Sequence, residues 1–207
     1  FTLYGTGVNK LNGNFITTGA VDLKGTSRTT ELFSNITIDN TNSDVTLGTI
    51  NGGTGTSDGT YDFNVNNGSG NIVAGNVGLV VKLKSLAFTG TGNTNIGTVD
   101  ATNGYDLGAD RGLTLNSDTT YNNPNVDVIL GAITLGDNVT LTLGNGGPGL
   151  ISVKSISGTA GGTTGALSGK SNIVIDSVGT VRVLGALGTD IGTLTITNSG
   201  GTTFSGT

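Results

Sequence analysis

The chain of 207 residues contains no cysteine, histidine, tryptophan or methionine, and only two prolines. Without cysteine and histidine, metal sites built from thiolate or imidazole ligands are excluded. Covalent or acid–base mechanisms that use either side chain are excluded as well. Any chemistry therefore depends on carboxylates, amides, hydroxyls and a few basic side chains.

Charged residues and long apolar runs are also scarce. Charged residues make up 11% of the chain and the net charge is −5, which argues against nucleic-acid binding, since phosphates require a basic face. The longest apolar run, 78–88, is interrupted by Lys82 and Lys84, so nothing approaches the roughly 20 apolar residues of a membrane-spanning helix. We expect no membrane insertion of this segment. The chain begins with Phe1 and shows no signal peptide, which indicates a mature product or an excerpt from a longer chain.

Glycine is abundant, with 38 residues, and threonine and asparagine are also frequent. These residues surround short segments of valine, isoleucine and leucine, as in chains with many tight turns between short strands. Helix-forming residues are scarce, since Glu31 is the only glutamate. The composition predicts an all-β fold, and the recurring apolar segments argue against disorder.

The short segments alternate between apolar and polar residues. Val139, Leu141 and Leu143 share one face of their segment, with threonines on the other face. The segments 79–84, 181–183 and 194–197 alternate in the same way, and their lysines and arginine fall on the polar side. Period-two alternation is typical of strands with one buried face.

A phrase of apolar residue, glycine, threonine and apolar residue recurs, and we interpret it as a corner between two strands. It is present at 47–50, 96–99, 178–181 and 191–194, with close variants at 130–133 and 184–187. Apolar strand centres near Ile133, Ile151, Ile173 and Ile196 are separated by about 18 to 23 residues, the range of solenoid repeats. We predict a single β-solenoid segment over 1–207, less regular over 1–45. The structural alternative is two tandem β-sandwich domains.

The later repeats resemble those of large Gram-negative surface proteins, the filamentous-haemagglutinin-like exoproteins and the autotransporter passenger domains. The resemblance depends on SNIVIDSVGTVRVLGALGTDIGTL (171–194) and DIGTLTITNSGGTTFSGT (190–207), and it covers about the last 110 residues. It implies a right-handed parallel β-helix exported to the cell surface, where it serves as an adhesin, a fibre or a stalk. Members of these families run to hundreds or thousands of residues. The absence of cysteine fits an extracellular protein of this kind.

Calcium is the only cofactor that the sequence suggests. GGTGTSDGT (52–60) resembles the Gly/Asp nonapeptide of calcium-binding solenoids, although it occurs once and Asp58 stands one place beyond the expected position. Asp106 and Asp110 could meet in one turn as oxygen ligands. An ordinary turn explains these aspartates better.

An enzyme is the alternative function that we weigh against a structural one. Parallel β-helices that act on polysaccharides use clustered carboxylates with a basic residue on one exterior face. In this chain only 106–111, DLGADR, brings two acids and a base together. We therefore expect no catalytic site. Glycans remain possible ligands, and the four tyrosines could stack against sugars, although Tyr61 fits better within a strand.

The final phrase, GGTTFSGT, ends without a polar cap or a charged residue. A solenoid's last turn exposes unpaired backbone groups and an apolar cross-section. We expect Thr202, Thr203 and Phe204 to form an edge for self-association, or to lead into a further turn if the chain is an excerpt of a longer rod. The sequence thus predicts a stiff, non-catalytic rod or fibre segment of an extracellular bacterial surface protein, with adhesive contacts to glycans or other cell surfaces.

Overall fold

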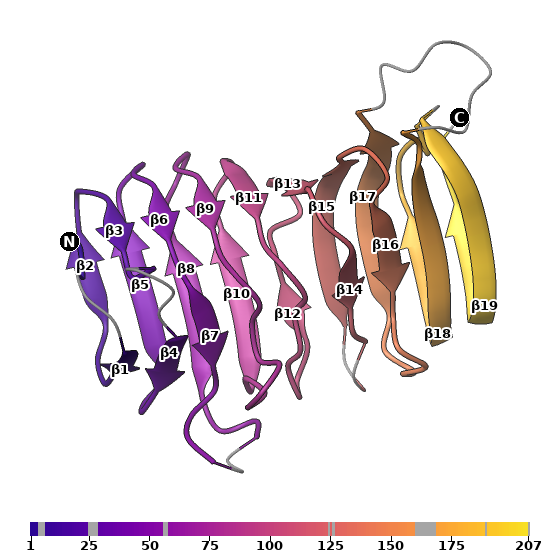
Figure 1. The fold of residues 1–207 in the computed structure, drawn as a ribbon. Coiled ribbons are helices and arrows are strands. Elements are labelled where there is room, and N and C mark those ends of the chain that lie inside the picture. The colour runs from indigo at the N-terminus through magenta and orange to yellow at the C-terminus, as the bar shows by residue number, and fades with distance from the viewer. Residues whose placement is uncertain are drawn as a thin grey trace.

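The computed structural model describes residues 1–3, 7–24, 29–55, 58–123, 125, 127–159, 169–188 and 190–206. These residues form a β-solenoid of about eight turns, shown in Figure 1 as a row of stacked strands from the N-terminus to the yellow strand β19. Every strand pair is parallel, and no helix is present in the described residues. The prediction of an all-β solenoid is confirmed. The tandem β-sandwich alternative is wrong, because sandwich sheets are antiparallel.

The coil has three faces, which we call A, B and C, and each turn contributes to all three. Face A contains β2 (Phe15–Thr17), β5 (Ile36–Asn40), β8 (Asp62–Asn66), β10 (Ser85–Thr89) and β12 (Tyr105–Asp106). Face B contains β3 (Val21–Asp22), β6 (Val45–Thr46), β9 (Ile72–Val73), β11 (Asn93–Asn95) and β13 (Gly112–Leu115). Face C contains β1 (Val8–Leu11), β4 (Thr29–Leu32), β7 (Thr49–Asn51), β14 (Thr119–Tyr121) and β16 (Thr140–Leu143).

The later strands are longer and bend from one face to the next. β15 (Val128–Leu135) and β17 (Ile151–Gly158) run from face A to face B. β18 (Ser171–Val183) and β19 (Ile191–Phe204) run from face C to face A. A residue therefore pairs with its counterpart one turn away, and that interval varies. Tyr105 follows its partner Leu86 by 19 residues, whereas Val181 follows Ile151 by 30.

The alternation seen in the sequence produces continuous rows of buried side chains. On face A, Ile38, Val65 and Phe88 lie in register on successive turns, and each is at most 1% exposed. The row formed by Leu141 and Ile173 on face C is buried in the same way. At about 25 cal/mol per Å² of apolar surface, these rows are the main stabilising contribution, together with hydrogen bonds between turns.

The Gly-Thr phrase marks corners, as predicted, in most of its copies. The copies at 47–50 and 96–99 lie between faces B and C, where the amide of Gly75 donates to the carbonyl of Gly48 at 3.1 Å. The copy at 130–133 bends β15 from face A to face B, and the copy at 178–181 bends β18 from face C to face A. The copy at 191–194 is different, because it begins β19 with a register shift opposite Ser171 and Asn172.

The prediction of a strand at 79–84 is wrong for its first residues. Leu79 and Val80 lie in a loop and are 47% and 77% exposed, while Leu83 is buried and forms a bridge to Ala101. Gly78 has a φ of 76°, which turns the chain out of face C before the alternating segment can extend. The sequence pattern was present, but the corner between two faces falls within it.

Candidate functional site

The last strand of the described coil is β19, on faces C and A. β19 pairs with β18 alone, so the other side of its backbone has no strand partner in the described residues. Leu194 and Ile196 lie in register with Ile173 and Ile175, and Phe204 lies in register with Val183. Leu194, Ile196 and Phe204 are 38%, 49% and 37% exposed, whereas their partners are at most 1% exposed. The predicted edge residues Thr202, Thr203 and Phe204 therefore belong to an uncovered apolar end.

The opposite end of the described coil is covered more fully. The ring of Phe1 packs against that of Phe15 with centroids 5.5 Å apart, and the terminal ammonium donates to the carbonyl of Ala20 at 2.6 Å. Leu11 on β1 is 4% exposed. The ammonium of Lys10 lies 5.3 Å from the centroid of the Phe33 ring, a cation–π contact. Core residues are thus less exposed at this end than at β19, although Phe1 is itself 54% exposed and β1 and β2 each pair with one strand only.

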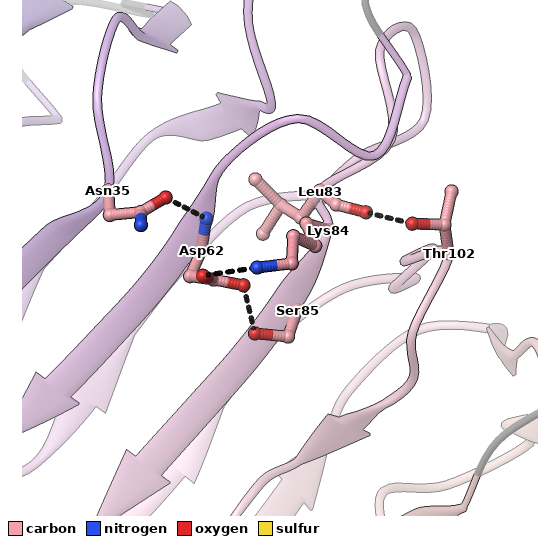
Figure 2. Close-up of polar contacts among 6 residues, drawn as sticks. All are labelled: Asn35, Asp62, Leu83, Lys84, Ser85 and Thr102. Carbon is pink, nitrogen blue, oxygen red and sulfur yellow. Dashed lines mark hydrogen bonds and ion pairs between the residues drawn. The ribbon is translucent and has the colours of Figure 1, made fainter.

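A polar cluster lies on the exterior where the chain enters face A (Figure 2). Asp62 is its centre: one carboxylate oxygen lies 3.0 Å from Nζ of Lys84 and the other accepts a hydrogen bond from Ser85 at 2.7 Å. The amide of Asp62 donates to Oδ1 of Asn35 at 3.1 Å. These residues come from three successive turns, so the cluster joins turns through side chains.

The chemistry of this cluster favours a structural role. Acid–base hydrolysis of glycosides requires two carboxylates on either side of a substrate, whereas this cluster has one, which is held by two donors. The Lys84 side chain is 42% exposed, and an exposed ion pair contributes about 0.2–1 kcal/mol. A second ion pair, between Lys82 and Asp100 at 3.1 Å, lies nearby and also joins two turns.

Each of the three aspartates suggested as calcium ligands contacts a different partner within the chain. Asp58 accepts a hydrogen bond from the amide of Lys82 at 2.8 Å, and Asp106 accepts one from the amide of Gly108 at 2.7 Å. Asp110 points to solvent, with Lys154 at 3.4 Å. Among the described residues, no group of three or more acidic side chains is placed to hold a metal ion. The structure thus provides no support for the calcium site. Asp106 stabilises a turn, and Asp110 forms an exposed ion pair.

Arg111, by contrast, lies inside the coil, which the sequence analysis missed. It is 1% exposed and its guanidinium makes five hydrogen bonds to uncharged oxygens. Nε donates to Oγ1 of Thr94 at 2.8 Å, and Nη1 donates to Oδ1 of Asn67 at 3.0 Å. The remaining bonds are from Nη1 to the carbonyl of Thr89 at 3.2 Å, and from Nη2 to the carbonyls of Gly70 at 2.9 Å and Asn93 at 3.3 Å.

Burial lowers the pKa of Arg111 from its ordinary value, because the charged form loses solvation. An arginine nevertheless stays protonated in proteins, so a positive charge lies within the core. The signal for this arrangement was in the sequence. Arg111, Leu113 and Leu115 follow a period of two, which places the arginine on the same face as two buried leucines. Thr94 likewise alternates with Ile96.

Asparagine side chains satisfy backbone groups at the corners. The Oδ1 of Asn76 accepts a hydrogen bond from the amide of Thr98, and that of Asp44 accepts one from Asn71, each one turn further along. The buried Asn123 donates to the carbonyl of Gly149 and to the hydroxyl of Ser177. Corners interrupt the backbone ladder, so short amide and carboxylate side chains supply the missing partners. This accounts for much of the asparagine content.

Two of the tyrosines proposed to stack on sugars are buried instead. The rings of Tyr105 and Tyr121 lie inside the coil with centroids 6.1 Å apart. The hydroxyl of Tyr105 donates to the carbonyl of Asn122 at 2.8 Å, whereas that of Tyr121 has no partner among the described residues. Tyr61 packs against the core, and Tyr4 lies outside the described residues.

Besides a groove of about 280 Å³ on face B, two further shallow grooves mark the exterior. One, of about 290 Å³, follows the corner between faces B and C beside Gly48, Gly75 and Val73. The other, of about 240 Å³, crosses face A beside Ala87, Gly104, Asp106, Asp127 and Ile129. Small residues on neighbouring strands produce the second groove, and two carboxylates border it.

Comparison of the chain with protein-family models, curated proteins and solved structures finds no match. No helix in the described residues is long and apolar enough to cross a membrane.

Proposed function

We propose that this chain is a non-catalytic structural and adhesive segment of an extracellular bacterial surface protein or filament. The observation that supports this most strongly is the combination of a parallel coil throughout the described residues and an uncovered strand edge at β19. About eight turns at about 4.8 Å each give a rod roughly 40 Å long. Repeated turns make a rod of this kind long and stiff. Many of its polar side chains form hydrogen bonds or ion pairs that join one turn to the next.

The extracellular placement depends on the resemblance of 171–207 to bacterial surface repeats and on the absence of cysteine. Exterior threonines and asparagines suit many weak contacts with glycans or other surfaces. The apolar side chains of Leu194, Ile196 and Phe204, together with the unpaired side of β19, suit another β-strand. In solutions of this chain a second copy is the available source of that strand.

Sedimentation velocity over a range of concentrations tests the association. Ile196→Lys places a charge on the uncovered end, and Val73→Lys makes the same kind of change at an exposed position in the middle of face B. We expect the wild type and Val73→Lys to associate alike, and Ile196→Lys to remain monomeric. Equal association of all three proteins would remove the basis for this part of the proposal.

The groove on face A supports a second candidate, a glycan-binding or polysaccharide-active site. Asp106 borders it from β12 and Asp127 from the position just before β15, and Ile129 supplies an apolar surface. Incubation with soluble polysaccharides, followed by assays for binding and for new reducing ends, distinguishes the two candidates. Binding or cleavage that is lost in Asp127→Asn and retained in Asp39→Asn, an exposed aspartate elsewhere on face A, would favour this alternative.

A further inference from the structure

The oxygens around Arg111 form a cage that belongs to other turns of the coil. Asn67 and Gly70 flank the corner between β8 and β9, whereas Thr89, Asn93 and Thr94 flank the corner between β10 and β11. Arg111 itself comes from the following turn, just before β13. Its five N–H groups therefore meet acceptors from two turns other than its own. Since a guanidinium has five N–H donors, all of them are used.

Glycines leave the space that the arginine fills. Gly90 follows Thr89, the partner of Asn66, and so stands where the preceding turn has Asn67. A Cβ at Gly108 would lie 2.7 Å from Cγ of Arg111, and one at Gly90 would lie 2.0 Å from the carbonyl oxygen of Gly68 and 3.0 Å from Nη1 of Arg111. In this turn the guanidinium occupies the corner that an asparagine side chain occupies in the turn before.

The position of Thr94 also suits the guanidinium. On face B the corresponding residues of neighbouring turns are Ile72 and Leu113, both buried and apolar. Threonine at this place has a hydroxyl where isoleucine has a carbon branch, and that hydroxyl accepts a hydrogen bond from Nε. None of the five acceptors is a carboxylate, so the cage presents neutral oxygens to a positive charge, as carbonyl-lined cation sites do.

We propose that this corner is a guanidinium-binding site which the chain fills with its own Arg111. Five acceptors, each matched to one N–H of a planar guanidinium, select a flat donor with a delocalised charge over a spherical ion. Arg111 acts as an internal ligand that holds three successive turns together. Emptied of the side chain, the cage takes up a free guanidinium-class cation, and the corner regains its stability.

Arg111→Ala tests this by chemical rescue, with guanidinium and methylguanidinium at low millimolar concentration as probes. We expect the variant to lose about 6–12 °C in Tm, and the probe to restore a few degrees in a saturable manner. Sodium, potassium and calcium chloride at matched ionic strength should restore nothing. Arg182→Ala, at an exposed arginine, is the matched control and should respond to no probe.

Equal effects of guanidinium on the wild type, Arg111→Ala and Arg182→Ala would overturn the proposal. If a metal ion raises the Tm of Arg111→Ala by as much as guanidinium does, the selectivity is wrong and the proposal is overturned. If Arg111→Ala folds only with the probe in the refolding buffer, the site is supported. If it fails to fold in every buffer, nitrogen-detected NMR of the wild type decides: slowly exchanging Nη–H signals from Arg111 support the cage, and rapid exchange contradicts it.

Discussion

The Nε–H of Arg111 donates to the hydroxyl of Thr94 inside the coil, over 2.8 Å, at a place where neighbouring turns have isoleucine and leucine. Two residues that break the apolar pattern of face B thus satisfy each other. The pattern of β11 alone does not account for the hydroxyl of Thr94, and the segment that leads into β13 does not account for the charge of Arg111. Together they show how a rod with so few charged residues places one of them in its core.

A double-mutant cycle measures this relationship. Thr94→Val alone should lower the free energy of unfolding by about 1–3 kcal/mol, because Nε–H loses its acceptor in a buried place. In an Arg111→Met background the same change should be neutral or stabilising, since valine fits a row that already contains Val45 and Ile72. Urea unfolding of the four proteins gives the coupling. Equal costs of Thr94→Val in both backgrounds would contradict the contact.

Inward and outward positions of β18 should differ sharply in tolerance. Ile173→Asp or Val181→Asp buries an unpaired charge, and we expect a loss of at least about 3 kcal/mol with several turns unfolding together. Arg182→Glu changes the exposed side chain next to Val181 and should cost within about 0.5 kcal/mol. Circular dichroism with urea and hydrogen exchange check both statements. Similar tolerance at all three positions would show that the assignment of faces is wrong.

The two buried tyrosines provide a matched pair. Tyr105→Phe removes the donor to the carbonyl of Asn122 and should cost about 1 kcal/mol. Tyr121→Phe removes a buried hydroxyl that has no partner in the described part of the chain, so it should be neutral or stabilising. Thermal unfolding near neutral pH compares the two. A larger loss for Tyr121→Phe than for Tyr105→Phe would indicate a partner for that hydroxyl.

Stability should also decrease at high pH. Burial raises the pKa of Tyr105 and of Tyr121, and for Tyr105 the charges of Tyr121 and Asp100 add to the effect of burial. Above about pH 10 the unfolded chain releases protons that the folded chain retains, so each tyrosine lowers the free energy of unfolding by about 1.4 kcal/mol per pH unit. Tyr121→Phe should reduce this slope relative to the wild type. An unchanged slope would contradict the raised pKa.

The sequence predicted the coil well where the pattern is local. Alternation in 139–143 and 181–183 identified strands with the correct buried faces, and the Gly-Thr phrase identified corners. The loop at 79–82 was missed because a corner position depends on how one turn lies on the next. Arg111 was missed because its acceptors come from other turns, up to 44 residues away in the chain. The β19 edge was expected from GGTTFSGT, and its exposed Leu194 and Ile196 become apparent only in register with β18.

The central claim is that this chain is a rod segment whose uncovered end receives another β-strand. Electron microscopy of the protein as isolated from its source, without cutting or refolding, tests it most directly. We expect long filaments one coil wide with an axial repeat of about 4.8 Å, or rods of twice the length of a single coil. Short single rods at every concentration, with no longer species, would contradict the claim.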